Sequence, residues 1–320
     1  MANFAPQMET IYYNNDTRID AECAATIGVF DGVHLGHRML LFELESEAKM
    51  AGYKTMAITF DRQPRQLFDA NYKPQLLTTQ KEKELLLSML GIDYMVVLPF
   101  TMEIAQFSAR DFMEQVLQDK LNVKLLQLGY DNRFGCGRAE GIDDYRRYGR
   151  EIGMKTRQSQ PLQFKGYSEP VSSSLIRRLI VEEGRVNEAM GLMARPLVLR
   201  GTVKPGEHIG STLGFPTANM EPEDDGKVIP ASGAYAVKVD LGDGESRPAM
   251  MNIGTRPTFD GQKQTLEVNI FDFEGDLYGH EIAVYFVKRL RDERRFDSPE
   301  ALKAQLEEDK KRTLEIINRE

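Results

Sequence analysis

The stretch GVFDGVHLGH, Gly28 to His37, decides how the first half of this 320-residue chain folds. It follows the apolar, β-prone run CAATI (23–27) and leads into the amphipathic run RMLLFELESEAKMAG (38–52). This order predicts a buried strand, a glycine-rich turn and a helix. Two of the four histidines of the chain, His34 and His37, lie three residues apart in the turn. A function must explain both of them.

The segments that follow repeat this alternation of strand and helix. The runs KTMAITF (54–60), DYMVVLPF (93–100) and VKLLQLG (123–129) predict buried strands. The runs TQKEKELLLSML (79–90) and SARDFMEQVLQ (108–118) predict helices, each opened by a Thr or Ser cap. Alternating β and α elements indicate a parallel sheet covered by helices. Because ligands of such sheets bind at the carboxyl ends of the strands, the glycine-rich turn is well placed for a ligand.

The second half has a different pattern, with strands separated by turn signals such as GDG and EGD. The strand-like segments are RPLVLRGTV, GAYAVKVDL, SRPAMMNIG, QTLEVNIFDF and HEIAVYFVKRL. A helix is predicted only at the end, with Ser298 as its cap and Pro299 in its first turn. We expect an α/β domain over residues 1–184 and an antiparallel β-barrel with a terminal helix over 185–320, in which 182–194 form a helical connector.

Composition excludes several classes of protein. The net charge of −8 lacks the basic bias of a nucleic-acid binder. No apolar run approaches the ~20 residues that span a bilayer, and the first residues do not resemble a signal peptide. Two cysteines do not make a disulfide framework, which favours a cytoplasmic protein with reduced thiols. The sequence leaves the oligomeric state open.

The residue types in the turn favour a phosphate site. No Lys follows the glycines, so the turn is not a Walker A loop, and their spacing is not GxGxxG. A zinc site of His34, His37 and Asp31 is disfavoured because the other histidines lie in the second half. Glycines let backbone N–H groups approach an anion, and the following helix points its positive end there. The alternative is that the histidines only cap or pack against the helix.

Longer motifs give the sequence a specific resemblance. GVFDGVHLGH resembles the G-x-F-D-G-x-H-x-G-H signature of the nucleotidyltransferase superfamily, in the form found in prokaryotic bifunctional riboflavin kinase/FAD synthetases. LGYDNRFGCGRAEG (128–141), VSSSLIRRLIVEEGRV (171–186) and GTVKPGEHIGSTLGFPTANM (201–220) are similar to later motifs of that family, in the same order. The resemblance implies a Rossmann-like nucleotidyltransferase domain followed by a flavokinase barrel, both using ATP with Mg²⁺. The implied small-molecule partners are riboflavin, FMN, FAD and ATP, with no nucleic acid or membrane.

For the first domain, the resemblance implies that FMN attacks the α-phosphorus of ATP to give FAD and pyrophosphate. His34 and His37 would contact the triphosphate, and Arg177 would grip its β- and γ-phosphates. The remaining residues that the resemblance assigns to this site are Gly28, Phe30, Asp31, Gly36, Asp131, Ser173 and Ser174. Asn132 stands where the family usually has an aromatic residue.

For the second domain, the resemblance implies transfer of the γ-phosphoryl group of ATP to riboflavin. Glu267 would be the base that accepts the proton of the 5′-hydroxyl, and Thr217 and Asn219 would be Mg²⁺ ligands. The residues assigned to ATP and flavin binding are Gly201, Lys204, Gly206, Gly214, Phe215, Pro216, Asn252 and Arg291. Ser211 replaces an Arg that is common in the family. A single-activity FMN adenylyltransferase with a decayed barrel and a non-catalytic flavin-binding regulator remain as alternatives.

Overall fold

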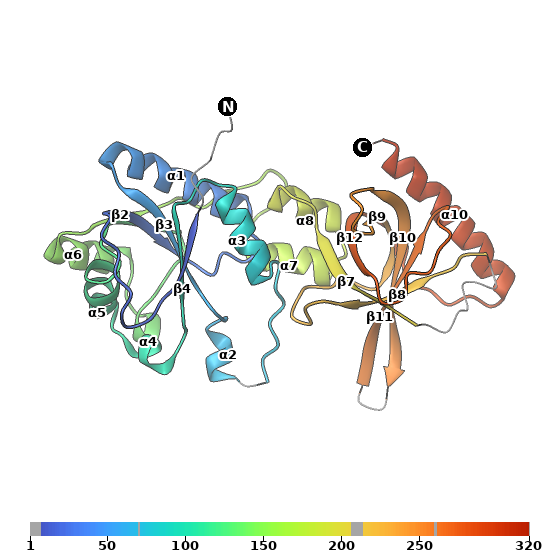
Figure 1. Ribbon diagram of the computed structural model, residues 1–320, viewed down its shortest axis with the longest axis horizontal. Helices are drawn as coiled ribbons and strands as arrows, with labels where there is room; N and C mark the ends of the chain where they lie inside the picture. Colours follow the sequence, from blue (N-terminus) through green and yellow to red (C-terminus); the bar gives the residue numbers. More distant parts are fainter. Residues whose placement is uncertain (1–7, 70, 206–213, 259–260, 320) are drawn as a thin grey trace. The chain divides into compact units, whose positions relative to one another are not determined.

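The computed structural model of the chain describes residues 8–69, 71–205, 214–258 and 261–319 (Figure 1). Contacts between residues divide the chain into two compact units, Met1–Ser173 and Ser174–Glu320, which are described separately. The division falls after Ser173, whereas the sequence led us to expect a boundary after residue 184. Backbone bonds explain this, because Ala231 donates to the carbonyl of Ile180 at 3.0 Å and ties the preceding helix to the second unit.

The first unit contains the predicted parallel sheet. Its six strands, in spatial order, are β1 (Glu9–Tyr12), β4 (Tyr94–Leu98), β3 (Lys54–Phe60), β2 (Cys23–Ile27), β5 (Val123–Leu128) and β6 (Lys155–Gln158). All neighbouring strands are parallel. Every residue of the central strand β2 is buried. The outer strands β1 and β6 were not expected, because they are short and half-exposed and so lack an apolar run.

Helices cover both faces of this sheet, and each face has its own core. On one face α1 (Leu35–Ala51) and α3 (Gln80–Ser88) pack through Leu44 and Leu87. The other face is covered by α5 (Ala109–Asp111), a π-helix (Phe112–Gln118) and α6 (Ile142–Ile152). Short helices α2 (Arg65–Phe68) and α4 (Met102–Gln106) occupy connections. The expected caps Thr79 and Ser108 are confirmed, whereas the helix expected over 108–118 is mostly π-helical.

The second unit is the predicted antiparallel barrel. Helices α7 (Ser173–Val181) and α8 (Val186–Met193) precede it. Its strands are β7 (Val198–Lys204), β8 (Ala218–Pro222), β9 (Gly233–Asp240), β10 (Arg247–Thr258), β11 (Gly261–Ile270) and β12 (Glu281–Asp292). They close in the order β10-β11-β8-β7-β12-β9. Strand β8 was not expected, because its sequence follows a turn motif, yet it supplies the pairing that joins β7 to β11.

The terminal helix α10 (Pro299–Ile317) packs on the barrel as expected. Ser298 caps it, since its Oγ accepts the N–H of Ala301 at 3.2 Å. A buried carboxylate of this helix, Asp309, accepts the Nε and Nη2 groups of Arg291 at 2.9 and 2.8 Å. The ion pair therefore anchors α10 to the last barrel strand.

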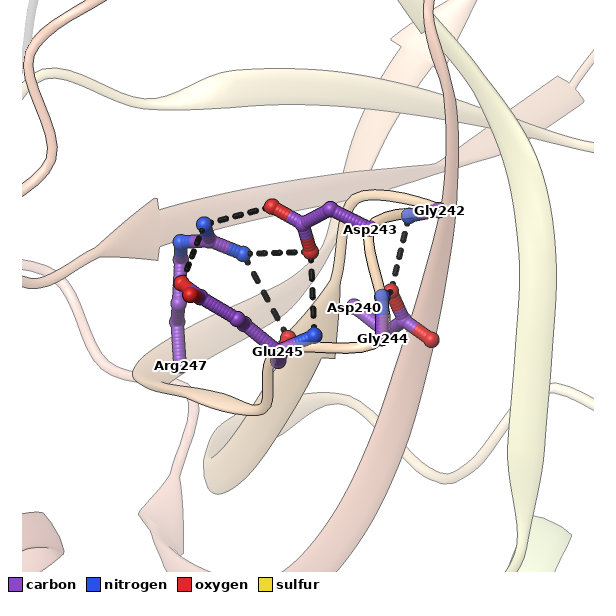
Figure 2. Close-up of polar contacts among 6 residues, drawn as sticks. All are labelled: Asp240, Gly242, Asp243, Gly244, Glu245 and Arg247. Carbon is purple, nitrogen blue, oxygen red and sulfur yellow. Dashed lines mark hydrogen bonds and ion pairs between the residues drawn. The ribbon is translucent and has the colours of Figure 1, made fainter.

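Figure 2 shows the turn between β9 and β10, which is tightly bonded within itself. The Asp240 carboxylate accepts the N–H groups of Gly242 and Gly244, while Arg247 bridges the carboxylates of Asp243 and Glu245. The Arg247 guanidinium lowers the pKa of Asp243 to about 2. The charged groups of the turn thus compensate one another, and they fix the register in which the two strands pair.

Candidate active sites

The Gly28–His37 loop turns sharply after β2. Gly28 donates to the carbonyl of Ile58 at 3.0 Å, which continues the sheet for one residue. Three of the next residues then take positive φ angles: Phe30 at 50°, Gly32 at 87° and Val33 at 41°. Such a conformation costs a residue with a side chain about 1 to 3 kcal/mol, so the surrounding packing must hold it. Phe30 and Val33 are indeed fully buried.

Asp31 is the residue that locks this turn. Its Oδ1 accepts the backbone N–H groups of Leu77 and Thr78 at 2.8 and 3.0 Å and the Thr78 hydroxyl at 3.2 Å. The Asp31 side chain is buried, and Ser173 Oγ donates to its backbone carbonyl at 2.8 Å. Asp31 therefore ties the loop to the segment before α3.

The two histidines form one unit. His34 is the N-cap of α1, and its Nδ1 accepts the backbone N–H of His37 at 3.3 Å. The two imidazole rings stack with centroids 3.7 Å apart and an interplanar angle of 18°. Because Nδ1 of His34 is an acceptor, the proton of the neutral ring is on Nε2, which makes Nε2–H a donor. Helix capping, the simpler alternative from the sequence, is thus one part of the role of His34.

Both histidines are neutral at physiological pH. Burial lowers the pKa of His34 to about 4. Burial, with smaller contributions from His34 and the Lys83 ammonium, holds the pKa of His37 well below its usual value. The pair therefore offers a phosphate N–H hydrogen bonds rather than positive charge.

The carboxyl end of β5 lies beside this loop, since β5 pairs with β2. Asn132 Nδ2 donates a hydrogen bond to the carbonyl of Ile27, the last residue of β2. The residue that departs from the family pattern thus binds the loop after β5 to the start of the Gly28–His37 loop. Asp131 is exposed at the same edge. On the other side, a Cβ atom on Gly36 would lie 3.2 Å from the carbonyl of Val171, so any other residue would make this segment shift by a few tenths of an ångström.

In the barrel, strand register brings predicted residues of the kinase into one transverse row. Lys204 of β7 pairs with Asn219 of β8, Asn219 with Glu267 of β11, and Glu267 with Asn252 of β10. Directly paired residues of antiparallel strands project from the same face. The row continues through Ala234 of β9 toward Arg291 of β12. Lys204, Asn219, Glu267 and Asn252 therefore lie side by side on four neighbouring strands. Arg291 lies far along β12 from the level of Lys204, because β12 pairs directly with β7 through Glu281 and Thr202.

A cavity of about 320 Å³ lies beside β8, and none of the row residues lines it. Its strand lining includes Val203, Ala218 and Val268, which project from the face opposite to the row because successive strand residues alternate. Pro216 and Thr217 line it, together with Phe273, Asp276 and Tyr278 from the turn before β12. Asn269 Nδ2 donates to the carbonyl of Pro216 at 2.7 Å and fixes that wall. A larger cavity of about 610 Å³ lies between α8 and β12. Among the described residues, no predicted site residue lines it.

Other predicted kinase residues have structural roles. Gly214 has a φ of 82°, and Phe215 is buried against Met250 and Phe271. A Cβ atom on Gly201 would lie 2.3 Å from the carbonyl of Glu221, so this glycine permits β7 and β8 to pack. Arg291 forms the ion pair with Asp309 of α10. Gly206 and Ser211 lie outside the described residues.

Comparison with known proteins shows the family of the chain. The family model for FAD synthetase matches residues 16–175, and the model for riboflavin kinase matches residues 193–317. The bifunctional riboflavin kinase/FMN adenylyltransferase of Escherichia coli K12 is 38% identical over 90% of each chain. That of Pseudomonas fluorescens is 36% identical over the same shares. The chain belongs to this bifunctional family.

One solved structure matches the family fold over almost the whole chain. It covers 95% of this chain and 98% of its own, with a TM-score of 0.85 and 31% identity. It is described as a macrolide-efflux protein of Streptococcus pneumoniae, whereas the two family models and the curated relatives name flavin enzymes. No helix among the described residues is both long enough and apolar enough to cross a bilayer.

The sequence did not single out Lys83, which the structure places beside the Gly28–His37 loop. This lysine is only 6% exposed, and its Nζ donates to Thr59 Oγ1 at 3.2 Å at the end of β3. The available signal was its spacing: Lys83 lies four residues before buried Leu87 and thus on the apolar face of α3. Neighbouring Lys81 is exposed, and residue type alone does not separate the two.

Proposed function

We propose that this chain makes FMN from riboflavin at the Asn219–Glu267–Asn252 row and makes FAD from FMN at the Gly28–His37 loop, with ATP as the second substrate of each step. The stacked, neutral histidine pair at the start of α1 is the observation that carries the proposal for the second step. The strand register around Glu267 carries the proposal for the first.

In the adenylyltransferase step, a phosphate oxygen of FMN attacks the α-phosphorus of ATP, and pyrophosphate leaves. Negative charge grows on the oxygens around the α-phosphorus as this happens. Donors that already point at this position stabilise the transition state, because they need no reorganisation. We assign this task to Nε2–H of His34, to His37 and to the N–H groups at the start of α1. Ser173, Ser174 and Arg177 would hold the leaving phosphates.

In the kinase step, the 5′-hydroxyl of riboflavin attacks the γ-phosphorus of ATP. Glu267 is half-buried between two asparagines and would accept the proton of that hydroxyl. Thr217 and Asn219 offer a hydroxyl and an amide oxygen, the hard donors that suit Mg²⁺. When bound, Mg²⁺ neutralises charge on the phosphates.

The same proposal places the enzyme in the cytoplasm, where the free thiols of Cys23 and Cys136 would stay reduced. Its partners would be riboflavin, FMN, FAD and ATP. Purified chain incubated with riboflavin, ATP and Mg²⁺, followed by separation of the flavins, tests the proposal. FMN that appears before FAD supports both steps, whereas riboflavin bound without either product contradicts them.

A further inference from the structure

Lys83 occupies an unusual position for a charged residue. It lies on the buried face of α3 and is only 6% exposed. Thr59 Oγ1, which takes one of its N–H bonds, itself donates to the carbonyl of Val29 at 3.2 Å. The Lys83 ammonium is therefore connected through the Thr59 hydroxyl to Val29, the second residue of the Gly28–His37 loop.

A buried ammonium normally needs a counter-charge. Moving such an ion out of water is costly unless a carboxylate or another anion pairs with it. Within the parts of the chain that the structure describes, Lys83 forms no ion pair. Asp31 is close enough to favour the charged form of Lys83, but its Oδ1 is bonded to Leu77 and Thr78. No carboxylate of the described residues is thus paired with the ammonium, and an anion from outside would supply the missing counter-charge.

A second polar group near the loop lacks a hydrogen-bond partner in the described part of the chain. His37 Nδ1 is buried and has no hydrogen-bond partner among the described residues. The positive charge of Lys83 is one of the groups that lower the pKa of His37, so the two side chains are near each other. Within the described chain, an ammonium without an ion-pair partner and a polar ring atom without a hydrogen bond therefore lie near each other, close to the carboxyl end of β3.

We propose that Lys83 is a phosphate-binding residue of the adenylyltransferase site, whose ammonium takes up a phosphate oxygen of a substrate beside His37. The proposal rests on the function proposed above for the loop. The oxygen would come from the 5′-phosphate of FMN or from the triphosphate of ATP. Removal of Lys83 then affects one Michaelis constant more than the other, and this difference identifies the source.

The competing explanation is that Lys83 only supports the loop through Thr59. The two explanations predict opposite effects of Lys83→Met, which keeps the length of the side chain and removes the charge. If Lys83 is a support, the variant loses stability and keeps its affinity for phosphates. If it binds phosphate, the folded chain is no less stable, because a buried charge without a counter-charge has been removed, and the affinity falls.

The test compares Lys83→Met with Lys49→Met, which removes an exposed lysine from the last turn of α1. We expect kcat/KM for adenylylation of FMN to fall about 100-fold in Lys83→Met. It should be unchanged in Lys49→Met, and riboflavin phosphorylation should be unchanged in both. A rise in KM for FMN alone identifies the FMN phosphate, and a rise in KM for ATP alone identifies the triphosphate. Adenylylation within twofold of the parent chain overturns the proposal.

A pH profile decides the matter even if Lys83→Met folds poorly. Burial lowers the pKa of Lys83 to about 8, while Asp31 of the loop and Glu84 of α3 oppose this shift. His37 of α1, which also faces Lys83, is neutral at this pH. We expect kcat/KM for FMN adenylylation in the parent chain to fall above about pH 8 as the ammonium loses its proton. In Lys83→Arg this fall should vanish, because a guanidinium stays charged. A flat profile in the parent chain, or the same fall in Lys83→Arg, contradicts the proposal.

If the function proposed for the loop is itself wrong, neither the parent chain nor Lys49→Met forms FAD from FMN. Binding of inorganic pyrophosphate, measured by calorimetry, then tests Lys83 alone. Binding by Lys49→Met and its loss in Lys83→Met supports the phosphate site, and equal binding by the two variants overturns it.

Discussion

His34 Nδ1 accepts the backbone N–H of His37, and the two imidazole rings stack 3.7 Å apart. One side chain therefore ends a strand-to-helix turn and orients the histidine that follows. The hydrogen bond determines the tautomer of His34 and leaves its Nε2–H as the group that can reach a ligand. Structural and chemical roles of His34 are separable by substitution, because they use different nitrogen atoms.

Replacement of His34 by Asn should separate these two roles. Asn is among the best N-cap residues, whereas Ala cannot accept the N–H of His37. We expect His34→Asn to keep the stability of the parent chain and His34→Ala to lose about 1 kcal/mol. Both variants should form FAD at least about 100-fold more slowly, since both lack the Nε2 donor. Urea unfolding and FAD formation from supplied FMN measure the two effects. A His34→Asn variant with full activity would contradict the donor role.

His37→Ala should abolish FAD formation and spare FMN formation. The two steps are assigned to separate units, so loss of a donor at the loop should not reach the row around Glu267. Chromatography of the flavins formed from riboflavin and ATP should show FMN accumulating without FAD. Equal loss of both products would reject the two-site assignment.

The stability of the chain should depend on pH through the buried histidines. The pKa of His34 is about 4 in the folded chain and near 6.5 when unfolded. Between these values the unfolded chain binds a proton that the folded chain does not, so the free energy of unfolding falls as pH drops from 6.5 to 4. Between pH 7 and pH 5 the expected loss from His34 is about 2 kcal/mol.

Urea unfolding of the parent chain and of His34→Asn at pH 7 and pH 5 measures this loss. The variant should lose less stability than the parent over this interval, by about the contribution of His34. Identical pH dependence of the two proteins would show that His34 does not titrate as its burial implies.

Glu267→Gln should stop riboflavin phosphorylation and leave adenylylation of supplied FMN unchanged. Glutamine has the shape of the carboxyl group but cannot accept the proton of the hydroxyl. General-base catalysis contributes about 10² to 10⁴-fold, and the loss of kcat should be of this order. Glu274→Gln, at an exposed position in the turn after β11, is the matched control. If Glu267→Gln retains the kinase rate of this control, Glu267 is not the base.

The sequence predicted elements that bury a long apolar run. The parallel strands β2 to β5, five barrel strands and the capped helices α3 and α10 are of this kind. It did not predict β1, β6 or β8, which are short, and whose pairing depends on distant strands. The π-helix over Phe112–Gln118 was missed for a related reason, since its hydrophobic spacing suits an α-helix. A local sequence pattern therefore predicts neither short strands with distant partners nor a π-helix.

The candidate sites were also predictable only in part. His34, His37, Asp31 and Glu267 were found because they stand in long motifs, and the structure supplied the relationships among them. The register row became visible only when the barrel closed, because its members come from different strands. Lys83 carries no motif, and its burial comes from the way α3 packs on the sheet.

The last prediction concerns Arg291, which the family resemblance places near the flavin and the structure pairs with Asp309. Asp309 is 1% exposed, so removal of Arg291 alone would leave a buried carboxylate without its cation. We expect Arg291→Met to cost about 3 to 5 kcal/mol of stability and to reduce kinase activity for that reason. The double variant Arg291→Met/Asp309→Leu removes both charges together. Replacing a buried ion pair by apolar side chains is often neutral, so the double variant should recover most of the stability.

Kinetics of the double variant decide between the two roles of Arg291. If Arg291 only anchors α10, the recovered barrel should show the KM for riboflavin of the parent chain. If Arg291 contacts the flavin, KM should stay raised although stability has returned. Urea unfolding and riboflavin saturation curves on the same three proteins separate these outcomes, because one readout follows the helix and the other follows the ligand.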